Sequence, residues 1–313
     1  MLGGVALLVW GMRMVQVGLN QAFGADLRRM IGISLRNRWL AWLTGLGVTA
    51  VLQSSTASAM LTVSFAREGL VDTAPGLAVM LGAGVGTSLV AQVLAFDLSW
   101  LAPLLILGGV LGYFSRRHSK QENLSQAAIG LGLMLLALHA MVALSQPLRD
   151  SLVLRDLLDA ASEPLLLVIL GALITWAAHS SLAIVLLVIS LAGAGVVSVP
   201  MGLALVLGAN LGGAMPPLIA TLGSAPEARR IPLGNLLSRL AGVVLVLLLL
   251  PQITPWVQRL GVDPGRLMAH FHTAFNLALS IGLIGLTTPL ARVLARLLPE
   301  RPASEYTEQP RYL

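Results

Sequence analysis

The chain has 313 residues, of which 56% are hydrophobic and only 11% are charged, and its mean hydropathy is +0.84. Soluble globular domains carry roughly a quarter charged residues, so this composition excludes an ordinary soluble protein and predicts an integral membrane protein. The net charge of +6 does not indicate nucleic acid, because the basic residues stand in short loops between apolar segments. Cysteine is absent from the sequence, which excludes disulfides and thiol chemistry.

Apolar segments follow one another along the whole chain, and most of them approach the roughly 20 residues that a membrane-spanning helix needs. They cover about residues 2–22, 39–66, 73–95, 98–114, 126–145, 164–192, 200–222, 231–251 and 267–297. We therefore predict an all-α integral membrane protein, with a single transmembrane domain at 1–297 and a polar C-terminal tail at 298–313.

Two of these segments do not fit a single crossing. Residues 39–66 would extend about 42 Å as a straight helix, against a hydrocarbon core of about 30 Å. We predict that this segment and residues 164–192 each fold back as a re-entrant helical hairpin, with "QSST" (53–56) and "HSSL" (179–182) at the tips. Polar groups at this depth are tolerated only inside protein or beside water, so the tips are expected to face a cavity.

The charges of the loops predict the orientation, because Lys and Arg are enriched on the cytoplasmic side. Basic residues gather at 28–38, 116–120, 229–230 and 292–301, whereas acidic residues balance them at 146–163 and 252–266. The first hairpin is therefore expected to enter from the cytoplasm and the second from outside. We expect a multi-pass protein of the plasma (inner) membrane with a cytoplasmic C-terminus.

An internal repeat organises the chain. Ser54 and Ser55 recur as Ser180 and Ser181, 126 positions further on. The same offset, without a gap, pairs Gly45 with Gly171, Gly82 with Gly208 and Gly86 with Gly212. We predict two inverted-topology repeats, each with a re-entrant hairpin and a glycine-broken transmembrane helix, at "GAGVGTS" (82–88) and at "GANLGGA" (208–214). Such repeats are typical of secondary transporters. The predicted units are repeat one at about 1–97, a linking helix at 98–125, repeat two at 126–223 and closing helices at 231–297.

The polar residues of the repeats are suited to binding ions. At each tip the second arm begins with free backbone N–H groups and a positive dipole end, which favour an anion. The predicted anion ligands are Ser54, Ser55, Ser180 and Ser181. Neutral oxygens suit a small hard cation, and the predicted cation ligands are Gln53, Thr56, Thr87, Ser88 and Asn210. Residues 73–95 and both hairpin interiors hold no Asp or Glu, so we expect anion and cation to raise each other's affinity.

At these residues the sequence resembles the type II sodium-phosphate cotransporter family (Na/Pi symporters). The family's signature is a repeated Gln-Ser-Ser-Ser followed by Gly-Ala-Asn-x-Gly-Thr-Thr, and "LGGVALLVWGMRMVQVGLNQAFGADLRRM" and "FHTAFN" (271–276) resemble its first and late helices. The resemblance implies sodium-driven uptake of inorganic phosphate by alternating access. It implies that the serine tips hold phosphate, that sodium is the coupling ion and that no other cofactor is needed. Many bacterial relatives continue into a regulatory domain, and we expect this member to lack it.

The second repeat departs from the family pattern. His179 occupies a glutamine position, Leu182 a hydroxyl position and Gly84 an asparagine position, while Gly213 and Ala214 replace the Thr-Thr pair. Three alternatives therefore stay open: proton coupling through His179, transport of another oxyanion, and a non-transporting anion sensor. The oligomeric state also stays open.

Three further polar residues lie in the closing helices. Arg239 is a candidate coupling or accessory group, although snorkelling to the cytoplasmic face is the favoured interpretation. His272 and Asn276, one turn apart, are interpreted as a structural polar contact. The sequence has neither a G-x-S-x-G elbow nor a zinc motif, so we do not expect an enzyme.

Overall fold

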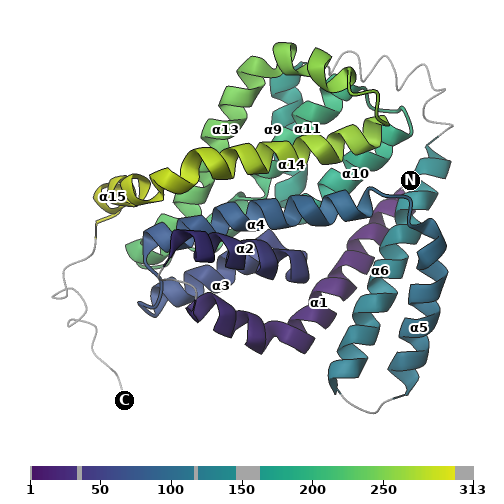
Figure 1. Cartoon of the computed structure of the whole chain (residues 1–313), viewed down its shortest axis with the longest axis horizontal. Helices are drawn as coiled ribbons and strands as arrows, with labels where there is room; N and C mark the ends of the chain where they lie inside the picture. The colour runs from purple at the N-terminus through teal and green to yellow at the C-terminus, as the bar shows by residue number, and fades with distance from the viewer. Residues whose placement is uncertain (1, 34–36, 116–118, 146–162, 300–313) are drawn as a thin grey trace.

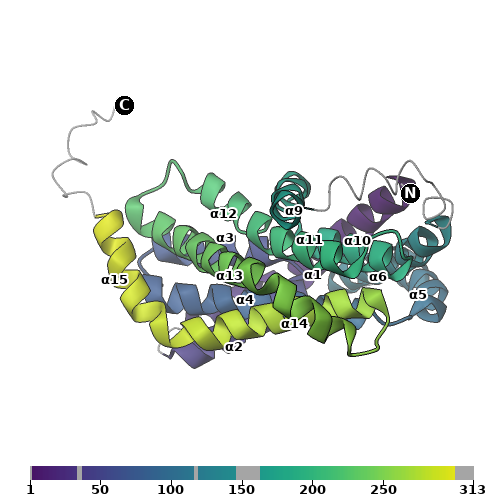
Figure 2. The same ribbon diagram turned by 90° about the horizontal axis from the view of Figure 1, so that it is seen from above.

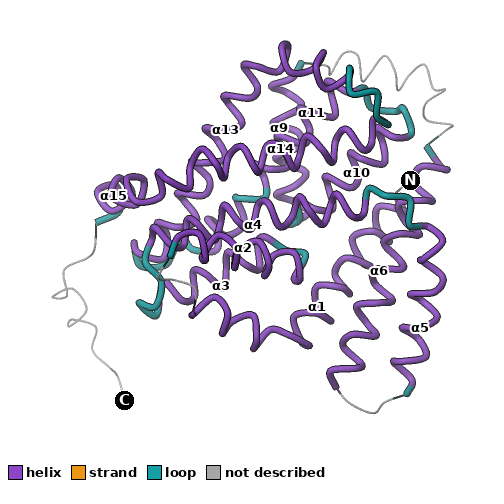
Figure 3. Tube along the Cα trace, viewed as in Figure 1, coloured by secondary structure: helices purple, strands orange, loops and turns teal. Residues whose placement is uncertain are grey.

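The structure, a computed structural model, describes residues 2–33, 37–115, 119–145 and 163–299 (Figure 1). Within these ranges all regular secondary structure is helical (Figure 3), as the apolar segments predict. Six helical segments of this part of the chain are long and apolar enough to cross a membrane. The protein is therefore an all-α, multi-pass membrane protein. The basic loop at 116–118, the loop at 146–162 and the tail at 300–313 lie outside the described residues.

The first half of the chain begins with α1 (Leu2–Ile33) and continues into a helical hairpin of α2 (Arg38–Leu52) and α3 (Ser55–Arg67). The chain turns at Gln53, whose φ of 51° lies in the left-handed region. Ser54 then caps α3, since its hydroxyl oxygen accepts the Ala57 N–H at 3.1 Å. The predicted hairpin break is thus confirmed at this tip. Helix α4 (Thr73–Leu94) follows and packs along α2.

A helical pair stands between the two hairpins. A short 3-10 helix, η2 (Ser99–Leu101), leads into α5 (Ala102–Phe114), which packs against α6 (Ser119–Leu144). Helix α6 also packs along α1, and Gly11 and Gly130 face each other where the two helices cross. A Cβ on Gly11 would lie 2.7 Å from the Gly130 carbonyl oxygen, so these glycines allow the backbones to approach closely.

The second half repeats the hairpin with α9 (Pro164–Ala178) and α10 (Ser181–Gly193). His179 takes the left-handed conformation with a φ of 53°, as Gln53 does in the first half. Ser180 caps α10 by accepting the Ala183 N–H at 3.2 Å. The second predicted break is confirmed as well. Helix α11 (Val199–Gly212) then packs along α9 as α4 packs along α2, and α12 (Met215–Ala220) follows.

The offset of 126 positions also relates the contacts that glycines make in the two halves. A Cβ on Gly45 would meet the Val79 carbonyl, and a Cβ on Gly171 would meet the Leu205 carbonyl. Likewise Gly82 lies against the Trp42 carbonyl and Gly208 against the Val168 carbonyl. Every member of the first half is 126 positions before its counterpart. The two halves therefore share the same hairpin-to-helix packing, and glycine is required where the backbones touch.

The predicted glycine break at residues 82–88 is wrong, because α4 runs through this stretch without interruption. Its glycines serve close approach instead, with Gly82 against the Trp42 carbonyl and Gly86 against the Leu46 carbonyl. In the second half the helix does end, at Gly212, before α12 begins at Met215. Pro216, four residues after this end, and Pro217 have no N–H to donate to the last carbonyls of α11. The first half lacks such prolines after its glycines.

The closing helices cover the hairpins. Helix α13 (Pro226–Gln258) packs on α11, and α14 (Pro264–Leu283) lies beside α4 in both views (Figures 1 and 2). A 3-10 turn, η3 (Ile284–Leu286), divides the predicted segment 267–297 and leads into α15 (Thr287–Leu297). Through these contacts α13 and α14 bring polar side chains against the middle of α4 and α11.

Candidate functional site

The two hairpin tips line one small cavity between them. Its lining residues are Gln53, Ser54, Ser55, Thr56, Thr87, His179, Ser180, Ser181 and Leu182. The structure therefore brings together all four predicted anion ligands and three of the predicted cation ligands. The volume of the cavity is about 10 Å³, which is roughly the room of one water molecule. In this structure the space between the tips is therefore smaller than a tetrahedral oxyanion.

Hydrogen-bond donors converge on this tip cavity. Helices α3 and α10 both begin there, so both direct first-turn N–H groups and the positive end of a dipole toward it. Ser180 donates its hydroxyl hydrogen to Met12 Sδ at 3.2 Å. The hydroxyls of Ser55, Thr56 and Ser181 make no hydrogen bond within the described chain, so they are available to a ligand. Such a set of donors without acidic neighbours suits an anion.

Neutral oxygens on the first half also face the tip cavity. The side-chain oxygen Oε1 of Gln53 is buried and has no hydrogen-bond partner within the described residues. The backbone carbonyl of the same residue accepts Gln16 Nε2 at 3.1 Å. Thr87 donates its hydroxyl hydrogen to the Ala83 carbonyl at 3.0 Å, which leaves its oxygen lone pairs for another partner. An unpaired buried acceptor is costly, and a cation is one ligand that would satisfy it.

His179 lines the same cavity but differs from Gln53 in its exposure. Its side chain is exposed, and Nδ1 lies 3.1 Å from the Ala177 carbonyl oxygen. The ring thus lies on the exposed side of the second tip. The second tip has no buried side-chain oxygen equivalent to Gln53 Oε1.

Ser88 and Asn210 do not line the tip cavity. Ser88 is buried on α4 and donates to the Val85 carbonyl at 2.8 Å. The side-chain oxygen Oδ1 of Asn210 accepts Arg239 Nη1 at 3.0 Å and Asn276 Nδ2 at 3.0 Å. The oxygen that was predicted to bind a cation is therefore occupied by two donors of the protein.

The prediction that Arg239 snorkels to the surface is wrong. Its side chain is 6% exposed and is held by oxygens of Asn210 and Asn235 in the interior. These oxygens satisfy the guanidinium where water cannot. Asn276 also donates to the His272 carbonyl at 2.9 Å, so these two residues form part of the same buried network.

Asn235 and the pair of Thr49 and Ser58 were missed by the sequence analysis. Asn235 stands four residues before Arg239 on α13, and this spacing places both on one helix face. Thr49 donates to the Ser58 hydroxyl at 2.7 Å, which joins the two arms of the first hairpin. The helical spacing of Asn235 was a usable signal, whereas the pairing of Thr49 depends on how the arms pack.

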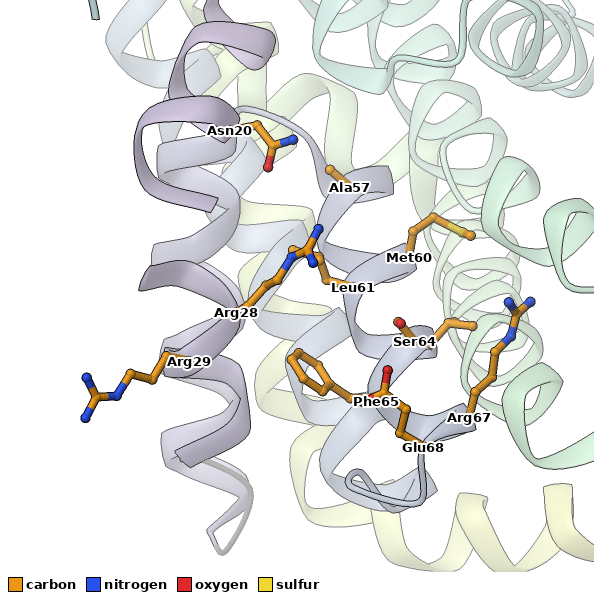
Figure 4. Close-up of a pocket in the computed structure, with 11 residues that line it drawn as sticks. Asn20, Arg28, Arg29, Ala57, Met60, Leu61, Ser64, Phe65, Arg67 and Glu68 are labelled. Atoms are coloured by element: carbon orange, nitrogen blue, oxygen red, sulfur yellow. The ribbon is translucent and has the colours of Figure 1, made fainter. Parts of the chain in front are cut away.

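A larger cavity of about 840 Å³ lies between α1 and α3 (Figure 4). It extends from Ala57, one turn into α3, to Arg67 at the far end of that helix. In the close-up the Arg28 guanidinium lies in the space between the two helices, and Arg29, which also lines the cavity, extends from the outer side of α1. Three arginines, Arg28, Arg29 and Arg67, line this cavity against one acidic residue, Glu68, so it would raise the local concentration of a small anion beside the first hairpin.

We expect Arg28→Gln to lower the initial rate of anion entry about threefold at low ionic strength, because a fixed positive charge steers anions toward the cavity. The difference should disappear at about 1 M salt, where the Debye length is about 3 Å. Radiolabelled phosphate flux at subsaturating concentration would measure it. Arg292→Gln is the matched control, since Arg292 is exposed on α15 and does not line this cavity. Equal losses for both variants, or a loss that persists in salt, would contradict steering.

The fold and the site together are of the kind found in secondary membrane transporters, in which hairpin tips and interrupted helices surround a polar cavity. The model of the Na+/Pi-cotransporter family matches residues 7–143 and 149–263 of this sequence, and the chain belongs to that family.

Similar proteins occur in several bacteria. A protein of Escherichia coli (strain K12) named "Putative inorganic phosphate export protein YjbB" is 37% identical over the full length of this chain, and its Salmonella typhimurium namesake is 36% identical. The chain spans 58% of the length of these relatives. An uncharacterized protein, YqeW, of Bacillus subtilis is 24% identical over 93% of this chain and 95% of its own. No solved structure matches the chain.

Proposed function

We propose that the chain carries inorganic phosphate across the membrane by alternating access, with the anion held between the two serine tips. The observation that carries the proposal is the shared cavity, which Ser54 and Ser55 line from one hairpin and Ser180 and Ser181 from the other. A tetrahedral oxyanion has enough acceptor oxygens to use donors from both tips. Family membership and the names of the Escherichia coli relatives support phosphate as the substrate.

The closed state of the tip cavity supports alternating access. Because the space is smaller than an oxyanion, phosphate can leave only if one tip withdraws from the other. Withdrawal of the first tip opens the site toward the basic cavity beside α3, and withdrawal of the second opens it toward the far end of α10. Each hairpin then acts as one gate.

The two halves are proposed to be inverted in the membrane. Helix α3 ends at Arg67, which donates a hydrogen bond to Ser224 just before α13. Helix α10 ends at Gly193, which shares a different cavity with Asp97, beyond the end of α4, and with Asp263. The hairpins thus reach the tip cavity from opposite ends of α4, which supports opposite orientations. By the positive-inside rule the end near Arg67 is cytoplasmic, in the plasma membrane.

Sodium is the proposed coupling ion, with Gln53, Thr56 and Thr87 as its ligands. The support is the unpaired Oε1 of Gln53 and the absence of acidic side chains from the lining of the tip cavity. A cation there would lower the cost of an anion in the same space. A coupled carrier is reversible, so the sodium and phosphate gradients decide whether phosphate is taken up or exported.

The test is radiolabelled phosphate flux in vesicles that contain the purified chain, with the sodium gradient directed inward, outward or absent. We expect phosphate to accumulate on the side toward which sodium flows. Flux that is driven by a pH gradient and does not depend on sodium would show that the coupling ion is a proton. That result would favour His179 as the coupling group. Phosphate binding without any flux would overturn the transporter and favour an anion sensor.

A further inference from the structure

Arg239 lies near the middle of α13 and carries a buried positive charge that only neutral groups surround. Its Nη1 donates to the Asn210 carbonyl at 3.2 Å and to Asn210 Oδ1 at 3.0 Å. Its Nε donates to Asn235 Oδ1 at 3.3 Å. No carboxylate among the described residues forms an ion pair with it. An uncompensated charge at membrane depth is costly, so its presence points to a compensating anion.

The room for this guanidinium comes from Gly84 on α4. A Cβ on Gly84 would lie 3.0 Å from Arg239 Nη2 and 2.5 Å from Asn276 Oδ1. Gly84 is the repeat counterpart of Asn210, 126 positions earlier. The second half thus keeps a side-chain amide at this position, whereas the first half has no side chain and the guanidinium fills the space. The first half therefore has the positive charge of Arg239 beside the position at which the second half has the side-chain amide of Asn210.

This charge is close to the tip cavity on two sides. Thr87, which lines the tip cavity, follows Gly84 by one turn of α4. Gly213, one turn after Asn210, approaches the second tip so closely that a Cβ there would lie 3.0 Å from Ser181 Cβ. One helical turn rises about 5.4 Å, so the two residues that contact the guanidinium, Gly84 and Asn210, each lie about one turn from residues at the tips. At that range a buried charge still acts on an anion.

We propose that Arg239 is a resident cation of the transport site. Its guanidinium takes the Asn210 oxygens that a sodium ion would otherwise bind, and it supplies the positive charge that this ion would bring to the anion. The inference rests on the proposed function. It deepens that function, because one positive charge at the site belongs to the protein and not to a sodium ion. Fewer sodium ions then accompany each phosphate.

The experiment is calorimetric titration of inorganic phosphate into the purified chain at several sodium concentrations, with choline keeping the ionic strength constant. In choline alone, Arg239→Gln should lower phosphate affinity about tenfold or more, since the variant loses a buried positive charge close to the anion. The Asn210 oxygens then become free for sodium. The slope of log phosphate affinity against log sodium concentration should therefore be steeper by about one than in the unmodified chain.

Two further variants separate charge from packing. Asn276→Asp places a carboxylate beside the guanidinium, so it should lower phosphate affinity like Arg239→Gln but leave the sodium slope unchanged. Arg239→Lys keeps the charge and should keep the slope of the unmodified chain. If Arg239→Gln does not give a monodisperse, cooperatively unfolding protein, Asn276→Asp and Arg239→Lys alone test the role of the positive charge. Arg259→Gln is the matched control, because Arg259 ends the same helix and is exposed.

Phosphate affinity and sodium slope that are the same in Arg239→Gln as in the unmodified chain would overturn this inference alone. An unchanged affinity in Asn276→Asp, or in Arg239→Lys a slope that has risen by about one, would also count against it. Failure of the unmodified chain to bind phosphate at any sodium concentration is a different result, which would overturn the proposed function and this inference with it.

Discussion

Replacing Ser55 and Ser181 together with alanine is expected to reduce phosphate affinity by roughly a hundredfold or more. Each of these hydroxyls faces the tip cavity and makes no hydrogen bond within the described chain. Loss of a hydrogen bond to a charged partner costs about 1.5 to 3 kcal/mol, or roughly tenfold or more in affinity for each residue. Because the two residues come from different hairpins, the single variants should each lose about tenfold.

Calorimetric titration of phosphate measures this prediction, and the repeat supplies a matched control. Ser64 and Ser190 stand nine positions after Ser55 and Ser181 on the same two helices, and neither lines the tip cavity. Ser64→Ala and Ser190→Ala together should leave phosphate affinity within about twofold. Full affinity in the Ser55 and Ser181 double variant would rule out the tips as the anion site. A loss confined to one of the single variants would place the anion on one hairpin only.

Gly82→Ala and Gly208→Ala are each expected to lower the free energy of unfolding by about 3 kcal/mol or more. A methyl group at either position would overlap a backbone carbonyl of the facing helix, that of Trp42 or that of Val168. A carbonyl in a packed helix cannot rotate aside as a side chain can. The hairpin and its companion helix would have to separate, which would also disturb the tip cavity one or two turns away.

Thermal unfolding of the purified variants in detergent measures the effect, with Gly47→Ala as the control. Gly47 belongs to α2 as well, but a Cβ there meets nothing within 4 Å. Alanine is favoured over glycine in a helix by about 1 kcal/mol, so this control should unfold at the same temperature or slightly higher. If Gly82→Ala unfolded like the control, the close approach of α2 and α4 would not exist.

The sequence predicted the hairpins well because two independent signals agreed. The apolar segments were too long for one crossing, and the same Ser-Ser pair interrupted both of them. The structure puts both turns at these motifs, where Gln53 and His179 have a positive φ. Neither residue is a glycine, so local propensity alone did not mark the turn. The repeated polar motif inside an apolar segment did.

The glycines were ambiguous because the same residue serves two purposes. Glycine weakens a helix, and it also lets two helices touch. Around Gly82 the second purpose prevails, while the end of α11 at Gly212 coincides with the prolines that follow it. Proline is not a general guide either, because α13 continues through Pro232, Pro251 and Pro255.

The surroundings of Arg239 were beyond sequence reasoning for a different reason. Position along a helix indicates how deep a side chain lies, but not which neighbours it meets. The partners of Arg239 come from α11, from its own helix and from the space beside Gly84 on α4. Only Asn235, four residues away, was within reach of a helical pattern. The others depend on the packing of segments that are far apart in the chain.

The tip cavity also has a consequence for how the protein is made. Because each half contributes only one wall, neither half alone would contain the proposed anion site. The first tip is synthesised long before the ribosome reaches the second. Under the proposed function, a nascent or truncated chain would enter the bilayer without a complete phosphate site, and anion binding would begin only when the second hairpin docks against the first.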